Sequence, residues 1–167
     1  MGFVSDKIKG EDAEDSVAKI LSDYWDVHKA SDLQSGAFSD WDLSVAQLGT
    51  GYEVFTVEVK YDEMQAKTGN IAIEIYNPKS GKPSGLTATK ASLWCQVLKD
   101  SVWITSVKAL RKFCEETTPF KMFSSAGDGN AAILLYKTED ILEIFERIDE
   151  CQNAQLQNKI NSLLQLT

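Results

Sequence analysis

Alternating apolar and polar residues at positions 55–61 (FTVEVKY) predict a β-strand. Side chains alternate between the two faces of a strand, so Val57 and Val59 belong to one face while Glu58 and Lys60 belong to the other. We expect the valine face to pack against the core. A glutamate and a lysine on the opposite face are most often solvated, so their meaning depends on what the fold brings near them.

A second alternating run at positions 39–45 (SDWDLSV) predicts another strand with one apolar face. Positions 48–51 (LGTG) supply a turn, because glycine reaches backbone conformations that other residues avoid. The two strands can therefore form a hairpin in which Asp42 lies across from the glutamate and lysine of the first strand. Asp40 and Asp42 also have a simpler interpretation, as charges that protect a strand edge from aggregation, and the pattern leaves both open.

A helix is predicted at positions 9–24, because its apolar residues recur at the spacing of one helical face. These residues are Ala13, Val17, Ile20, Leu21 and Tyr24. Glu14 stands on the flank of this apolar stripe, where a carboxylate needs a partner such as a metal ion or a lysine. The alternative is an ordinary, partly exposed helix carboxylate.

The middle of the chain alternates between strand and helix patterns. Positions 70–77 (NIAIEIYN) predict a strand, 88–98 a helix, 102–107 a short apolar strand and 106–116 a second helix. The expected inward-facing residues of the helix at 88–98 are Ala91, Trp94, Cys95 and Leu98. Glu74 on the strand is a further candidate for the acidic cluster, or a partner of the lysine at position 60.

The C-terminal part of the chain predicts a hairpin followed by a helix. Positions 122–125 and 131–137 flank a turn-rich segment (SAGDGN), and Thr138 is expected to cap the final helix. Apolar residues from 141 to 166 recur at helix-like but imperfect spacing. Core packing is the expected role of this stretch, and homodimer formation through it is an alternative.

Length and composition favour one domain spanning residues 1–167. A chain of 167 residues that is 43% hydrophobic can bury a sizeable core. No apolar run approaches the length of a membrane span and no secretory leader begins the chain, so we expect no membrane association. The three cysteines match neither a zinc pattern nor a disulfide framework, which favours reduced thiols in the cytoplasm.

A net charge of −8 argues against a nonspecific nucleic-acid coat, which would be basic. Positive charge is concentrated locally at positions 79–90 (KSGKPSGLTATK), which contain three lysines and no acidic residue. Glycines allow a phosphate to approach the backbone, so Lys79, Lys82 and Lys90 are candidates for contacts with a DNA backbone. The alternative is a flexible connection between two elements.

The two predicted strands and the helix together suggest a metal site. Two carboxylates can hold a hard divalent cation such as Mg²⁺ or Mn²⁺ through oxygen ligands, leaving positions for water and a substrate phosphate. A nearby lysine can orient the attacking water or stabilise the charge that develops on the phosphate. This combination is what metal-dependent cleavage of a phosphodiester requires.

Three motifs in this order resemble the PD-(D/E)XK nuclease superfamily, which has the restriction-endonuclease-like fold. They are KGEDAED at 9–15, WDLSV at 41–45 and VEVK at 57–60. The first is similar to the opening of archaeal-type Holliday-junction resolvases. The resemblance covers roughly the first hundred residues, and it departs from the family pattern where Trp41 and Asp40 stand in place of a proline before Asp42.

The resemblance implies a role for each matching residue. Asp42 matches the metal-binding aspartate, Glu58 the second acidic ligand and Lys60 the motif lysine. Glu14 matches the helix glutamate, as an outer or second-metal ligand, and the main-chain carbonyl of Val59 would be a further metal ligand. A catalytically silent nucleic-acid-binding or protein-interaction module of the same fold is the alternative.

The resemblance also implies an architecture. We expect an α/β fold with an α-β-β-β-α-β core at about residues 5–118, in which helices flank a mixed central sheet. An added hairpin and helix would form an extension at about 119–167. The implied activity is an Mg²⁺- or Mn²⁺-dependent deoxyribonuclease, with DNA as its partner.

Overall fold

The computed structural model describes residues 2–33, 40–126, 131–152 and 154–165, and it contains two β-sheets and six α-helices within those ranges. The first sheet has six strands in the spatial order β1-β2-β3-β6-β7-β10. Their bounds are β1 Trp25–Lys29, β2 Leu43–Gln47, β3 Glu53–Tyr61, β6 Leu93–Leu98, β7 Ser101–Ser106 and β10 Glu146–Arg147.

The first sheet is mixed. Strands β1, β2 and β3 form an antiparallel meander, while β6 runs parallel to β3 with Val57 opposite Leu93. Strands β7 and β10 continue the sheet in antiparallel pairing. The protein is therefore an α/β protein with a mixed sheet, as the sequence predicts.

The second sheet is antiparallel and has the order β5-β4-β9-β8. Its strands are β4 Asn70–Asn77, β5 Lys82–Pro83, β8 Lys121–Ala126 and β9 Ala131–Lys137. The predicted hairpin is present as β8 and β9, although most of its turn lies outside the described residues. A short 3-10 helix, η1 (Gly85–Thr87), leads from β5 towards β6.

The helices differ in length and position. Ser106 caps α4 by accepting a hydrogen bond from the backbone amide of Ala109 at 3.0 Å. The helical bounds are α1 Gly2–Ser22, α2 Ala30–Leu33, α3 Gln65–Thr68, α4 Val107–Glu116, α5 Thr138–Ile141, η2 Leu142–Ile144 and α6 Ala154–Leu164. No helix in the described ranges is both long and apolar enough to cross a membrane.

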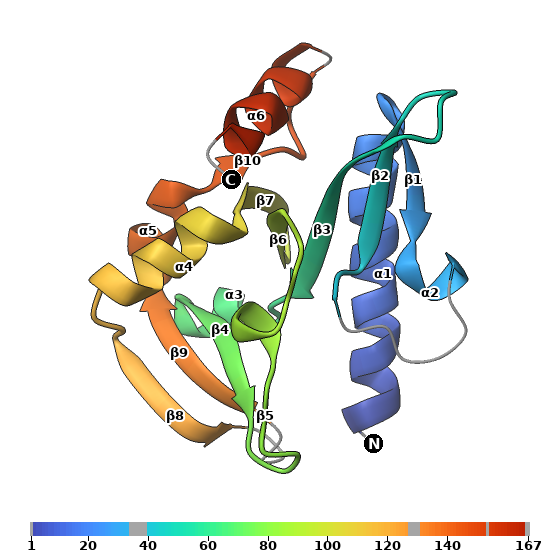
Figure 1. Cartoon of the computed structure of the whole chain (residues 1–167). Helices are drawn as coiled ribbons and strands as arrows, with labels where there is room; N and C mark the ends of the chain where they lie inside the picture. Colours follow the sequence, from blue (N-terminus) through green and yellow to red (C-terminus); the bar gives the residue numbers. More distant parts are fainter. Residues whose placement is uncertain (1, 34–39, 127–130, 153, 166–167) are drawn as a thin grey trace.

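Two apolar clusters lie on opposite faces of the first sheet. Figure 1 shows helix α1 on one side of β3 and the second sheet on the other. On one face, Val57 and Val59 of β3 pack with α1 and α6. On the other face, Trp94 and Leu98 of β6 pack with the second sheet and with α4. The first sheet is thus covered on both sides, which explains why β6 is buried throughout and β3 is buried from Phe55 to Val59.

The prediction of a helix at 88–98 is wrong, because these residues enter the first sheet as β6. All six residues of β6 are buried, so apolar side chains occupy both faces and the alternation typical of a half-exposed strand is lost. The apolar positions 91, 94, 95 and 98 coincidentally match a helical period. Cys95 and Trp94 in fact point to opposite faces of the sheet.

Two further strands differ from the prediction. The strand at 70–77 exists, but as β4 it belongs to the second sheet and not to the central one. Strand β1, which the sequence did not reveal, takes its place in the meander. Its five residues (WDVHK) include Asp26, His28 and Lys29, so the sequence shows no clear strand pattern here.

The C-terminal stretch is divided into short elements rather than one helix. Thr138 is the first residue of the four-residue α5, and Lys137 occupies its cap position. The chain then passes through η2 and β10 before α6 begins. Leu156, Ile160 and Leu163 of α6 are buried in the first-sheet core of the same chain, so these apolar residues are used internally.

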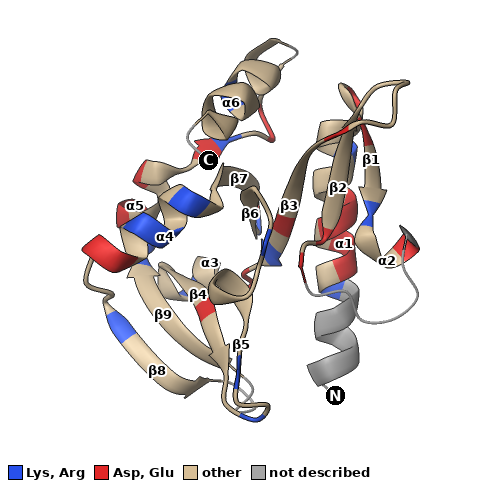
Figure 2. Ribbon diagram, viewed as in Figure 1, with Lys and Arg blue, Asp and Glu red and all other residues tan. Residues whose placement is uncertain are grey.

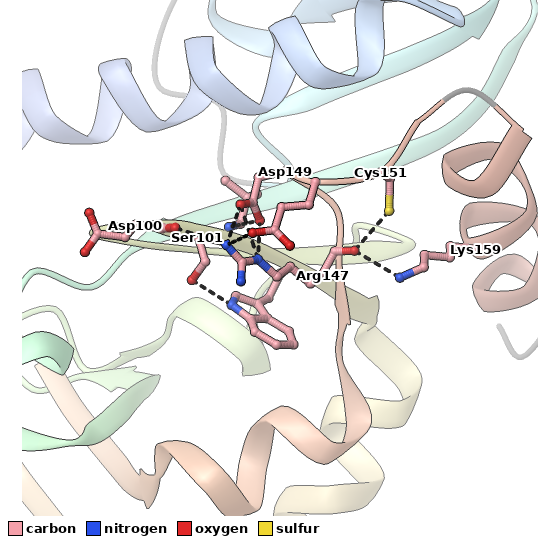
Figure 3. Close-up of polar contacts among 9 residues, drawn as sticks. Asp100, Ser101, Arg147, Asp149, Cys151 and Lys159 are labelled. Carbon is pink, nitrogen blue, oxygen red and sulfur yellow. Dashed lines mark hydrogen bonds and ion pairs between the residues drawn. The ribbon is translucent and has the colours of Figure 1, made fainter.

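Polar contacts around Arg147 fix this C-terminal stretch to the first sheet (Figure 3). The guanidinium of Arg147 lies 3.0 Å from Asp149, whose carboxylate also accepts a hydrogen bond from the amide of Val102. The carbonyl of Arg147 accepts hydrogen bonds from Lys159 and Cys151. The middle of α6 is therefore connected to β7 through β10.

Candidate functional site

Residues from α1, from β3 and from the segment just before β2 meet at the end of β3. A cavity of about 310 Å³ is lined there by Glu14, Asp42, Val59 and Lys60, together with Lys9, Gly10, Tyr61 and Glu63. Charged residues of α1 and β3 gather in this part of the molecule (Figure 2). Four of the five residues predicted to form the metal site thus line one cavity, and the fifth, Glu58, is bonded to Lys60.

Asp42 is held in place by the neighbouring strand. Its backbone amide donates to the carbonyl of Val57 at 3.0 Å, and its carboxylate accepts a hydrogen bond from the amide of Val59 at 2.7 Å. Burial and the nearby Glu58 raise the pKa of Asp42, and Lys60 and the Val59 amide oppose this shift. Two acidic groups in mutual repulsion are a favourable setting for a cation.

Glu58 and Lys60 form a close ion pair on the face of β3 opposite Val57 and Val59. The Lys60 ammonium lies 2.6 Å from Oε1 of Glu58, and Glu58 is only 6% exposed. Burial lowers the pKa of Lys60, but Glu58 and Asp42 outweigh burial and raise it above its ordinary value. Lys60 therefore remains a cation at neutral pH.

Glu14 faces the same cavity from α1. Burial, followed by the negative charge of Asp42, raises the pKa of Glu14 to about 7, while Lys29 acts in the opposite direction. The ammonium of Lys29 lies 4.0 Å from Glu14 and 2.6 Å from Asp15. Lys29 was missed at the sequence level because β1, which carries it, was not recognised.

The two additional acidic candidates lie differently. The carboxylate of Asp40 is 2.9 Å from the ammonium of Lys90, so Asp40 has its own partner. Glu74, on β4 in the second sheet, is near enough to contribute to the raised pKa of Lys60, although less than Glu58 and Asp42 do. Neither residue lines the cavity with Asp42.

The three lysines proposed for DNA contacts lie away from the cavity lining. Lys79 is in the turn between β4 and β5, Lys82 is in β5, and both are exposed. Lys90 precedes β6 rather than lying in a helix, and it pairs with Asp40. The structure therefore brings the proposed metal-site residues together and leaves these lysines outside the cavity lining.

The side chains at this site suit an Mg²⁺ ion that keeps water ligands better than a metal ion bound by protein ligands alone. Among the residues that the structure describes, no three His, Cys, Asp or Glu side chains gather closely enough to hold a metal ion by themselves. Mg²⁺ is commonly bound by only one or two carboxylates, with water and substrate phosphate as its other ligands. Asp42 and Glu58 would be these carboxylates, and the carbonyl of Val59 would be a further oxygen donor.

Thr89 is a site residue that the sequence did not identify. Its hydroxyl lies 2.8 Å from Oε2 of Glu58, across 31 positions of the chain, and only the fold brings them together.

Comparisons of this chain with protein families, curated proteins and solved structures found no match. We therefore infer the function from the geometry of the site.

Proposed function

We propose that this protein is an Mg²⁺- or Mn²⁺-dependent nuclease that hydrolyses phosphodiester bonds in DNA. The observation that carries the proposal is the convergence of Asp42, Glu58 and Lys60 at the end of β3. Asp42 reaches this point by accepting a hydrogen bond from Val59, and Lys60 lies 2.6 Å from Glu58. Two carboxylates and a permanent cation are the side chains that this reaction requires.

The strand order supports a restriction-endonuclease-like core as the finer description of the fold. Helix α1 is followed by three antiparallel strands, β1, β2 and β3, and then by β6 parallel to β3. The proposed order is α-β-β-β-α-β, so the fifth element differs. Here the connection from β3 to β6 contains α3, β4, β5 and η1, and the second sheet covers the face where a helix was expected.

The proposed mechanism assigns a separate task to each residue. A bound metal would supply a more acidic water ligand and would neutralise charge on the phosphate. Asp42 and Glu58 would hold it, with the Val59 carbonyl as a third donor. Lys60 stays charged, so it would orient the attacking water and stabilise the phosphate in the transition state rather than accept a proton.

Glu14 would assist from the opposite wall of the cavity. Its pKa of about 7 lets its carboxyl group take up or release a proton near neutral pH. The residue would therefore serve as an outer ligand or as a relay for the proton that leaves the attacking water. Its position on α1, rather than on the sheet, separates this task from that of Lys60.

The proposed substrate class, DNA, is based on the local concentration of positive charge in the chain. A chain with a net charge of −8 needs local cations to hold a polyanion, and Lys79, Lys82 and Lys90 form the acid-free segment proposed for that contact. The cysteines Cys95, Cys114 and Cys151 are all free thiols, which suits a reducing cytoplasm. DNA is the proposed partner, with the scissile phosphate at the metal.

A catalytically silent binding module of the same fold is the second candidate. Both carboxylate oxygens of Glu58 already have partners, since Oε1 contacts Lys60 and Oε2 contacts Thr89. This pairing compensates the buried charge without a metal. A module that retains the fold for binding alone would show DNA binding without metal-dependent cleavage.

A cleavage assay on plasmid and branched DNA tests the proposal. Wild-type protein should nick or cut DNA with Mg²⁺ or Mn²⁺ and should be inactive with excess chelator. Asp42→Asn should lose the activity, whereas Asp40→Asn, with the same change in charge two positions away, should retain it. Absence of metal-dependent cleavage by the wild type on all substrates would favour the silent module.

A further inference from the structure

The carboxylate of Glu58 is held between two polar groups in a nearly dry environment. Oε1 lies 2.6 Å from the Lys60 ammonium, and Oε2 lies 2.8 Å from the hydroxyl of Thr89. Glu58 is 6% exposed and Thr89 is 3% exposed, so water does not compete strongly for these contacts. The two contacts together determine the orientation of the carboxylate plane.

The hydroxyl of Thr89 has one proton to donate and two acceptors near it. It lies 2.8 Å from Glu58 and 3.0 Å from the carbonyl of Asp40. The carbonyl of Asp40 also accepts a hydrogen bond from the backbone amide of Lys90 at 2.8 Å, so it keeps a hydrogen-bond donor without Thr89. An ionised carboxylate is the stronger acceptor, and the Thr89 proton is therefore directed to Glu58.

The backbone of Thr89 is fixed from a different element. The guanidinium of Arg111, on α4, donates to the carbonyl of Thr89 at 2.7 Å and to the carbonyl of Leu86 at 3.0 Å. The amide of Ala91 donates to the Thr89 hydroxyl at 3.2 Å. Thr89 is thus a buried, doubly anchored donor and not a side chain on a loose connection.

The same segment is attached to the chain that carries Asp42. The backbone amide of Lys90 donates to the carbonyl of Asp40 at 2.8 Å, a link that does not depend on the side chain of Asp40. Asp40 lies two positions before Asp42, so residues 89 and 90 link the start of β2 to the Glu58 position of β3. A shift of this segment would change the relation between the two carboxylates.

We infer that Thr89 is a positioning residue that orients Glu58 for metal binding. The inference rests on the proposed function, because it assigns to Thr89 the task of aiming the second acidic ligand. Loss of the hydroxyl would leave Oε2 without its donor and let the carboxylate turn further towards Lys60. Hydrogen-bond partners of metal ligands typically change metal affinity or activity about 10- to 100-fold when they are removed.

Three single substitutions test the inference. Thr89→Val keeps the shape of the side chain and removes the hydroxyl, while Thr89→Ser keeps the hydroxyl. Thr87→Val is the matched control, since the Thr87 hydroxyl bonds the carbonyls of Ile75 and Ser84 and does not touch Glu58. Mn²⁺ affinity by calorimetry and the rate of DNA cleavage at saturating Mn²⁺ are measured for each folded variant.

We expect Thr89→Val to weaken Mn²⁺ binding or to slow cleavage by about 10-fold or more. Thr89→Ser should restore most of the loss, and Thr87→Val should match the wild type. If Thr89→Val does not fold, Thr89→Ala takes its place with the same expected loss.

Wild-type behaviour of Thr89→Val would overturn the inference while leaving the proposed function intact. Equal defects in Thr89→Val and Thr89→Ser would also overturn it, because the hydroxyl would then not matter. A wild-type protein that neither binds Mn²⁺ nor cleaves DNA would instead refute the proposed function, and the inference with it.

Discussion

At the scale of single residues, the site depends on how charges are balanced. Lys60 is a cation between Glu58 and Asp42, and its ammonium also lies 6.0 Å from the ring of Trp94. Because Glu58 is buried, Lys60 contributes to folding as well as to the proposed chemistry. The sequence predicts only the second of these tasks, since it does not reveal how deeply Glu58 lies.

Lys60→Ala should separate the two tasks. Without metal, we expect a loss of roughly 1 to 3 kcal/mol in unfolding free energy, because the buried Glu58 loses its partner. The Lys60 side chain is 35% exposed, so solvent screening keeps the loss within this range. With saturating Mn²⁺ the fold should be restored, while cleavage should fall about 100-fold or more. Lys67→Ala, at an exposed position on α3, is the control, and wild-type cleavage by Lys60→Ala would remove this lysine from the mechanism.

The raised pKa of Glu14 predicts that the stability of the fold depends on pH. Its pKa is about 7 in the folded protein and 4.5 ordinarily, so the folded state binds the proton more tightly. Glu14 therefore makes the fold less stable as the pH rises from about 4.5 to 7, by up to about 3 kcal/mol.

Urea unfolding of metal-free Glu14→Gln and wild type across this pH range measures the effect. The variant should gain stability relative to the wild type as the pH rises, and the difference should become constant above about pH 8. Glu115→Gln, on the exposed side of α4, should run parallel to the wild type. Parallel curves for Glu14→Gln would show that the carboxyl is not buried beside Asp42.

At the scale of elements, β3 could be predicted and β6 could not. Apolar and polar residues alternate along β3, with Val57 and Val59 packed towards α1 and Glu58 and Lys60 on the opposite face. Strand β6 is buried on both faces, so it has no polar alternation to distinguish it from a helix. The contact of Thr89 with Glu58 was equally hidden, because it depends on the crossover between β3 and β6.

Gln96 distinguishes the observed strand from the expected helix. In β6 its side chain is 1% exposed and accepts a hydrogen bond from the indole of Trp94 at 3.1 Å, whereas on a helix packed through Trp94 and Leu98 it would point outwards. Gln96→Leu should lower the unfolding free energy by about 1 to 3 kcal/mol, because the indole N–H loses its acceptor.

Denaturant unfolding of this variant is compared with that of Gln157→Leu, at an exposed position on α6. The control should change stability by less than about 0.5 kcal/mol. Equal stability of Gln96→Leu and the wild type would mean that position 96 faces solvent, which would contradict the strand assignment.

At the scale of the whole molecule, the negative charge of the chain means that the proposed activity requires local positive charge at the phosphate. A protein with a net charge of −8 repels a polyanion unless positive charge is concentrated where the phosphate lies. Lys60 alone is largely compensated by Glu58 and Asp42. A divalent cation would reverse the sign of the local charge, and binding to the folded state alone would stabilise the protein by mass action.

Calorimetric titration of the metal-free protein with Mn²⁺ tests the central claim most directly. The account predicts saturable binding by the wild type and a loss of about tenfold or more in affinity for Asp42→Asn. It predicts unchanged affinity for Asp40→Asn, whose carboxylate pairs with Lys90. Absence of saturable binding by the wild type, or equal binding by Asp42→Asn, would contradict the assignment of Asp42 and Glu58 as a metal site.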